Sequence, residues 1–201
     1  MEKIIKYSKQ EPVLFGLYAL ANNTTGGVNS SFGYKALFAN TIGFQNVAIG
    51  RSALEANTTG SNNVAVGFES LCKNTTGTSN TAVGKGALKA NLTTSENTAV
   101  GTTAMNGNTG SCNTGVGSSA LENVTGDSNT AVGRRALYLN TSGTLNTAVG
   151  ICSSHSMTSG QQNISIGGNS LLVNTTGSRN SALGQSSLST NISGNDNVAV
   201  G

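Results

Sequence analysis

The sequence predicts an all-β fold, a parallel β-solenoid or β-roll of about twelve rungs of 17 residues. A pentapeptide of the form Asn-x-small-apolar-Gly recurs through the chain, as in NVAVG at 63–67 and NTAVG at 80–84 and 129–133. Its final glycines are 17 residues apart, except for two steps of 16 that end at Gly117 and Gly133. The composition is also unlike that of a globular domain, with 27 glycines in 201 residues and only 9% charged residues, against a usual ~25%.

Each pentapeptide predicts one strand. Alternation along a strand sends the small residue and the apolar residue after it to opposite faces. The apolar slot is Val, Ile, Leu or Phe in every rung, and we expect its side chains, including Val66, Val83 and Val132, to point into the core. The small slot, such as Ala48 or Ala131, would then lie on the other face and let a neighbouring chain approach closely.

Two other slots of the repeat predict its corners and its stacking. The glycine that ends each strand favours a left-handed or tightly turned backbone, because a Cβ atom would be penalised there. The second glycine of the rung, as in NTTG at 57–60, is expected to do the same at another corner. The asparagine that opens the strand predicts a ladder of stacked amides along the axis. These slots include Gly50, Gly67, Gly84, Gly133 and Gly150, and Asn63, Asn80 and Asn129.

The remaining slots predict the solvent face and the extent of the repeat. The consensus between strands is G-x-x-A-L-x-x-N-T-T-G-x-x-N, and all fourteen charged residues after Glu11 fall on its x-x pairs. We therefore expect the x-x pairs to face solvent and the Leu slot to be buried. Residues 12–201 form the predicted β-roll, which is expected to continue or to be capped beyond Gly201. Residues 1–11, which carry five charges, predict an N-terminal cap or attachment segment.

The side chains that enzymes need are sparse, and the sequence predicts no enzyme, no cofactor and no metal site. His155 is the only histidine and stands in an irregular rung, where a surface loop explains it. Cys72, Cys112 and Cys152 occupy three different slots of the repeat, which favours free thiols over disulfides. Asp occurs too rarely for the calcium-binding nonapeptide type of solenoid.

Charge and hydropathy limit the partners. The net charge is +3, and no basic stripe interleaves with aromatic residues, so nucleic acid is not expected as a partner. No apolar run approaches the ~20 residues of a membrane-spanning helix, so membrane insertion of this segment is not expected. Sequons such as those at Asn57, Asn74, Asn140 and Asn174 follow from the Asn-Thr turn of the repeat, and the sequence leaves their glycosylation open.

The NTAVG-xx-AL-xx-NTTG rungs over residues 12–201 resemble the head repeats of trimeric autotransporter adhesins. They resemble more closely the 17-residue relatives in surface and fibre proteins that often carry a C-terminal endosialidase-type chaperone. The resemblance implies a left-handed β-roll, a homotrimeric fibre, and a host or surface ligand such as a glycan.

These observations together predict a structural or adhesive fibre protein that presents a rigid rod for surface or host attachment. A place on a virion is slightly favoured over a bacterial cell surface, because Met1 leads straight into a rung without an export signal. Two alternatives stay open. One is an ice-binding solenoid, since threonines recur, although the x of N-x-A-V-G varies. The other is a glycan-acting tailspike, which would need carboxylates clustered on a groove.

Overall fold

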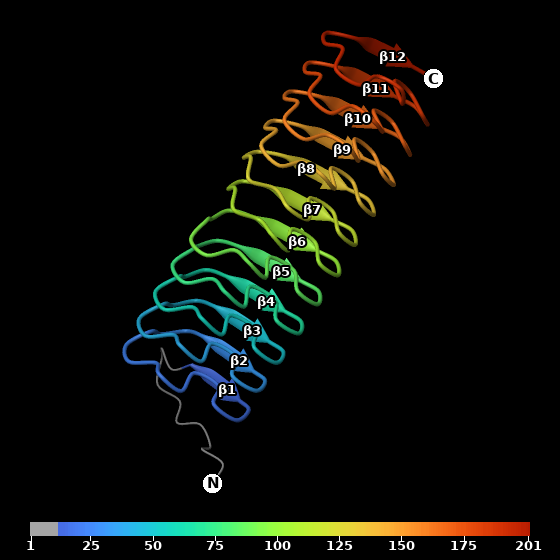
Figure 1. Cartoon of the computed structure of the whole chain (residues 1–201). Helices are drawn as coiled ribbons and strands as arrows, with labels where there is room; N and C mark the ends of the chain where they lie inside the picture. Colours follow the sequence, from blue (N-terminus) through green and yellow to red (C-terminus); the bar gives the residue numbers. More distant parts are fainter. Residues whose placement is uncertain (1–11) are drawn as a thin grey trace.

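A computed structural model describes residues 12–201, and in it these residues form a single rod of twelve short parallel strands stacked in chain order (Figure 1). The cap predicted for residues 1–11 lies outside the described residues. Each strand has three residues and is followed by a run of tight turns that returns the chain to the next strand. The strands are β1 Val13–Phe15, β2 Ser30–Phe32, β3 Val47–Ile49, β4 Val64–Val66, β5 Thr81–Val83, β6 Thr98–Val100, β7 Thr114–Val116, β8 Thr130–Val132, β9 Thr147–Val149, β10 Ile164–Ile166, β11 Ser181–Leu183 and β12 Val198–Val200.

The register of the sheet follows the sequence repeat. Thr81 of β5 pairs with Val64 of β4 and with Thr98 of β6, in each case 17 residues away. The step falls to 16 where Thr114 pairs with Thr98 and with Thr130, at the two short intervals of the sequence. The predicted parallel β-solenoid with 17-residue spacing is therefore confirmed.

Hydrogen bonds between rungs also form away from the strands. The Leu37 N–H donates to the carbonyl oxygen of Ala53 at 3.0 Å, on the side of the rung that carries the Ala-Leu pair. At the Asn-Thr corner the Thr58 N–H donates to the Thr75 carbonyl oxygen at 2.9 Å. Each rung is thus tied to the next around its circumference, which makes the solenoid a stiff rod.

The core is narrow and contains small side chains on one side and leucines on the other. From β2 to β11 the middle residue of the strand, such as Ala65, points inward and is buried, and so are Ala87 and Leu88 of the Ala-Leu slots. Where Met105 replaces the leucine, the facing strand residue is Gly115, and a Cβ there would lie only 2.8 Å from Met105 Cγ. Such paired changes keep the interior filled.

The expectation that the apolar slot points into the core is wrong. Val83 and Val132 are 37% and 38% exposed, and Val66 is half-buried. The alanine between the two outer strand residues occupies the interior, so the small slot does not face a neighbouring chain. The physical reason is the narrow interior, in which the leucines from the turn side reach the strand and leave room only for a methyl group.

The two glycine slots require glycine for different reasons. Gly50 has φ +128°, and the corresponding glycines of all rungs lie between +123° and +140°, the region expected from the sequence. A Cβ on Gly50 would also lie 2.6 Å from the carbonyl oxygen of Gly67. The second glycine, by contrast, does not have positive φ. At Gly60 a Cβ would collide with Asn57 Oδ1 and with the carbonyl oxygen of Gly77, so close packing of rungs excludes a side chain.

Candidate functional surfaces

The outward face of the strands carries an uninterrupted apolar row, which we call the strand ridge. It consists of the third residue of every strand, and most of these side chains are more than one third exposed. The ridge residues are Phe15, Phe32, Ile49, Val66, Val83, Val100, Val116, Val132, Val149, Ile166, Leu183 and Val200. A repeat of identical rungs thus places one large apolar side chain at the same position of each turn along the whole rod.

A second outward row runs beside the ridge and is formed by the first residue of each strand. From β5 to β9 it is threonine in five consecutive rungs, each half-buried, and elsewhere it is valine, isoleucine or serine. Because both rows belong to one parallel sheet, they form a single face that is apolar on one side and partly hydroxylated on the other.

The asparagines of the strand-opening slot form the expected ladder inside the rod. Asn63 is fully buried, and its backbone N–H and side-chain Nδ2 donate to Asn46 Oδ1 at 3.0 and 3.2 Å. Its Nδ2 also donates to the carbonyl oxygen of Gly77 at 2.9 Å. Asn80 and Asn129 repeat these contacts with the asparagine of the preceding rung. These amides hold the rungs together, and burial keeps them from contacting a ligand.

A second asparagine ladder, which was not predicted from the sequence, uses the asparagine of the NTTG corner. Asn57 Nδ2 donates to Asn40 Oδ1 at 2.8 Å, and Asn74 Nδ2 donates to Asn57 Oδ1 at the same distance. The ladder is interrupted where Val124 and Met157 occupy the slot, and Asn140 Oδ1 consequently has no hydrogen-bond partner. The signal was present in the sequence, because the same slot is asparagine in most rungs.

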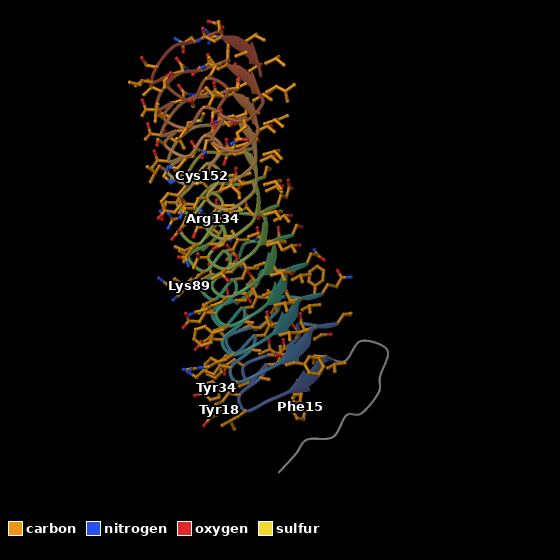
Figure 2. The ribbon with its side chains drawn as sticks, turned by 90° about the vertical axis from the view of Figure 1, so that its right-hand side faces the viewer. Phe15, Tyr18, Tyr34, Lys89, Arg134 and Cys152 are labelled. Atoms are coloured by element: carbon orange, nitrogen blue, oxygen red, sulfur yellow. The ribbon has the colours of Figure 1, made fainter. Side chains whose placement is uncertain are left out.

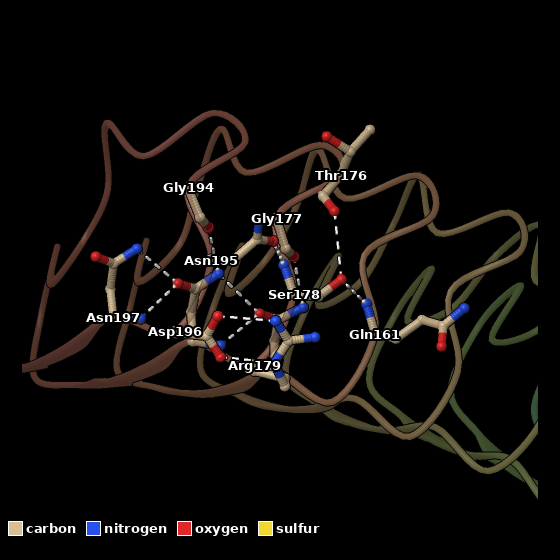
Figure 3. A network of polar contacts seen from close by, with 11 residues as sticks. Gln161, Thr176, Gly177, Ser178, Arg179, Gly194, Asn195, Asp196 and Asn197 are labelled. Carbon is tan, nitrogen blue, oxygen red and sulfur yellow. Dashed lines mark hydrogen bonds and ion pairs between the residues drawn. The ribbon is translucent and has the colours of Figure 1, made fainter.

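Polar side chains on the surface also pair from rung to rung, as Figure 3 shows near the C-terminal end. Arg179 donates through Nε and an Nη atom to the two carboxylate oxygens of Asp196, at 2.6 and 2.8 Å. The Ser178 N–H donates to Asn195 Oδ1 at 2.7 Å. Side chains 17 residues apart in the sequence are therefore direct neighbours in space. No charged residue among 12–201 is buried, so the prediction that charges lie at the solvent face is confirmed.

The turn segment after the first glycine carries a cluster of aromatic and cationic side chains, which we call the aromatic patch. It comprises Tyr18, Tyr34, Lys35, Phe38, Arg51 and Phe68. Figure 2 places Tyr18 and Tyr34 on the side of the rod opposite the strands, which carry Phe15. The patch and the strand ridge therefore occupy separate faces.

Within the patch, cations and rings alternate at successive rungs. The guanidinium carbon of Arg51 lies 6.0 Å from the ring centre of Tyr34 and 5.5 Å from that of Phe68. Lys35 Nζ lies 5.7 Å from the Tyr34 ring centre and 5.5 Å from that of Phe38. These distances are typical of cation–π contacts. The contacts of Lys35 lie within its own rung, whereas those of Arg51 join residues one rung apart and are not visible along the chain.

A smaller cluster surrounds the histidine. His155 stacks on Tyr138 with ring centres 5.2 Å apart and an interplanar angle of 21°, and Arg135 lies 5.4 Å from the Tyr138 ring centre. Partial burial and the nearby charge of Arg135 hold the pKa of His155 below its usual value. The imidazole is therefore neutral at pH 7 and belongs to a surface stack.

The cysteines lie apart and are unpaired. Burial, and then the charges of Glu55 and Glu69, raise the pKa of the Cys72 thiol, while a hydrogen bond from Cys112 Sγ to Glu96 raises the pKa of Cys112. Among residues 12–201, no three His, Cys, Asp or Glu side chains converge as metal ligands would. In the same part of the chain, no helix is long and apolar enough to cross a membrane.

Comparison with protein-family models, with curated proteins and with solved structures finds no match to this chain.

Proposed function

We propose that the chain is the rod of a homotrimeric fibre, with a structural or adhesive role at a virion or cell surface. The observation that supports this proposal most is the strand ridge, which has a large apolar side chain in every rung and exposes it in most of them. Water-exposed apolar surface of this extent marks an interaction site. The resemblance to adhesin heads and fibre proteins points in the same direction and adds left-handedness to the proposal.

The dimensions of the strand face suit a partner of equal length. Twelve rungs at about 4.8 Å span roughly 55 Å, and the two outward rows lie about 7 Å apart. With the width of the side chains, this face amounts to roughly 500 Å², and the ridge is its continuous apolar part. A site of this shape calls for a long, straight partner.

A second and a third copy of the chain fit this requirement. A parallel copy has the same rise per rung, so each ridge side chain meets its counterpart at the same level along the whole rod. Three copies around an axis parallel to the rod would cover all three ridges, and cyclic symmetry uses the same surface of each chain. The ridge carries no charged residue that would oppose this contact.

The oligomeric state tests the proposal directly. Light scattering and native mass spectrometry on the full chain should give a particle of three times 20.2 kDa. A well-folded particle of 20.2 kDa in dilute solution would refute the trimer. The proposed role involves presentation of a surface and no catalytic turnover, so attachment should survive replacement of His155 and of each cysteine.

Ice binding is a second candidate, favoured by the threonine row of β5 to β9. These threonines face outward beside the ridge at a regular spacing. Thermal hysteresis of the full chain, and of a Thr114→Lys variant, tests this function. Thermal hysteresis that is present in the natural chain and lost in the variant would favour ice binding by an open strand face. A natural chain without thermal hysteresis would contradict ice binding and favour the fibre.

A further inference from the structure

We propose that Tyr34, Arg51 and Phe68 form a binding subsite for a carboxylated oligosaccharide that lies along the rod. This inference rests on the proposed adhesive function and deepens it by naming a ligand class and a place for it. It starts from the fact that all three side chains are exposed although Arg51 contacts both rings.

Arg51 is the cation of the patch that has no carboxylate partner. Lys35 is paired with Glu55 at 3.3 Å, and one rung further Glu69 is paired with Lys89 at 2.6 Å. Among the described residues, Arg51 takes part in no ion pair. The charges around Arg51 are thus neutralised in pairs, while its own guanidinium group is available to an anion.

The rings on either side of Arg51 orient its guanidinium group. Contacts with Tyr34 on one side and Phe68 on the other restrict its movement, and Arg51 is exposed, so its N–H groups are open to an anion. A guanidinium edge presents two parallel donors that match the two oxygens of a carboxylate. Restraint before binding lowers the entropy lost when the ligand is bound.

The exposed rings themselves favour sugar over other anions. Tyr34 is 41% and Phe68 is 38% exposed, so each ring leaves apolar surface open to the C–H groups of a pyranose. The two rings are two rungs apart, which is about 9.6 Å along the axis. A sugar with its linkage advances by a similar length to one rung, so an acidic sugar at Arg51 would have its neighbours beside the two rings.

Nucleic acid fits the same surface less well. A phosphate backbone has one charge per nucleotide and requires a row of cations. On the first slot after the glycine, the neighbours of Arg51 are Tyr34 and Phe68, and the next cation in this slot is Lys85. One unpaired guanidinium group between two rings instead suits an oligosaccharide that carries one carboxylate per two or three sugars.

A hyaluronan hexasaccharide is a suitable probe, because it carries a carboxylate on every second sugar. The matched neutral ligand is chitohexaose, which has the same N-acetylated sugars without the carboxylates. Calorimetric titration of the full chain should show binding of the acidic probe and at least about tenfold weaker binding of the neutral one.

Arg134 provides a control variant on the same rod. It occupies the same slot as Arg51 and is exposed, but its neighbours in the adjacent rungs are Ser118 and Ile151. Arg51→Gln should weaken hyaluronan binding about tenfold or more, and Arg134→Gln should change it less than about twofold. Phe68→Ala should weaken it as well, while the circular dichroism of all three variants stays unchanged.

The other outcomes overturn the inference. Equal losses in Arg51→Gln and Arg134→Gln, or equal affinity for both sugars, would show that Arg51 reads no carboxylate. Displacement of the sugar by a poly-Glu peptide or an oligonucleotide of equal affinity would assign the patch to anions in general. Light scattering on the same samples separates the two proposals. A trimer that does not bind hyaluronan contradicts this subsite alone, while a monomer that binds it contradicts the trimeric fibre alone.

Discussion

Thirty-two residues other than glycine have positive φ among residues 12–201, an unusual density for L-amino acids. They fall on three slots of each rung: the second residue after the first glycine, the Leu slot, and the residue before the strand-opening asparagine. Lys35, Leu37 and Gln45 are an example, with φ of 56°, 52° and 55°. Each such residue costs roughly 1–2 kcal/mol in the left-handed region, and glycine and asparagine least. The stacking contacts between rungs must offset this cost.

The first prediction at the residue scale concerns Leu145, which has φ 59° and is 56% exposed. Leu145→Asn should raise the free energy of unfolding by about 0.5–1 kcal/mol, because asparagine tolerates this conformation better. Leu139→Asn is the control, since Leu139 is also exposed but does not have positive φ. Urea denaturation of both variants is the measurement, and an equal change in the two would contradict the explanation.

A second prediction at this scale concerns pH. The pKa of His155 lies below 6.5 in the folded chain, first because of partial burial and then because of Arg135. As pH falls below 6.5, the unfolded chain therefore binds more protons than the folded chain, and stability is lost. His155→Phe keeps the stack on Tyr138 but cannot titrate. Its melting temperature should fall less than that of the natural chain between about pH 7 and 5.

The histidine titration also has an internal control. Arg135→Gln removes a positive charge near the imidazole, so the pKa of His155, followed by NMR, should rise. If the melting temperatures of the natural chain and of His155→Phe fell equally with pH, groups other than His155 would cause the loss of stability in acid.

At the scale of the element, a rung is a unit whose slots compensate one another. The rung that begins at Gly150 departs most from the consensus, with Ser154 in the Leu slot and Met157 in the slot of the second asparagine ladder. Met157 is fully buried, so its side chain fills part of the volume that a leucine occupies elsewhere. The departure from the consensus leaves two buried oxygens, Ser154 Oγ and Asn140 Oδ1, without a hydrogen-bond partner.

The corresponding prediction restores the consensus in this rung. Ser154→Leu together with Met157→Asn should stabilise the rod by about 1–3 kcal/mol, since an unsatisfied oxygen gains a donor and the core is refilled. Each change alone should be less favourable. Ser154→Leu beside the retained methionine overfills the core, and Met157→Asn beside the retained serine leaves a cavity. Chemical denaturation of the two single variants and the double variant measures the coupling, and strictly additive effects would contradict it.

For the whole molecule, the two long faces of the rod have different expected roles. The strand ridge is proposed to meet other copies, and the aromatic patch on the opposite side is proposed to meet a ligand. Figure 2 shows the two sides as separate, with Phe15 on the strands and Tyr34 on the turns. A trimer closed through the strands would therefore leave the patch accessible.

The prediction at this scale compares Val132→Asp with Arg134→Asp. Both side chains are exposed in a single chain, so a monomeric rod would tolerate the two variants equally. In a trimer, Val132→Asp places an unpaired charge in each buried ridge and should cost about 3 kcal/mol per chain. Light scattering and melting curves at fixed concentration should then show dissociation for this variant only. Identical melting temperatures and masses for the two variants would show that the ridge is not part of a trimer interface.

The sequence by itself determined the period, the strand positions and the parallel stack. A slot that repeats every 17 residues must form the same contact in each rung, so the recurrence of Asn63 and Asn80 predicts the ladder that the structure contains. The charged residues predicted the solvent face, because they are confined to the x-x pairs and these pairs occupy the same position in each rung. The candidate patch was also encoded, since Tyr34, Arg51 and Phe68 are each 17 residues apart, but it becomes visible only when the chain is read across rungs.

The tertiary structure alone decided which face of the strand is inside. Alternation in Thr81-Ala82-Val83 defines two faces but is symmetric between them, and burial of Ala82 depends on how closely the leucines of the opposite turns approach. The turns that bring them close contain three left-handed residues per rung, and these are mostly leucines and residues of varied type, which do not signal a positive φ in the sequence. The coil closes tightly enough that a methyl group fills the interior at the strand, and the larger apolar side chain is left on the outer surface.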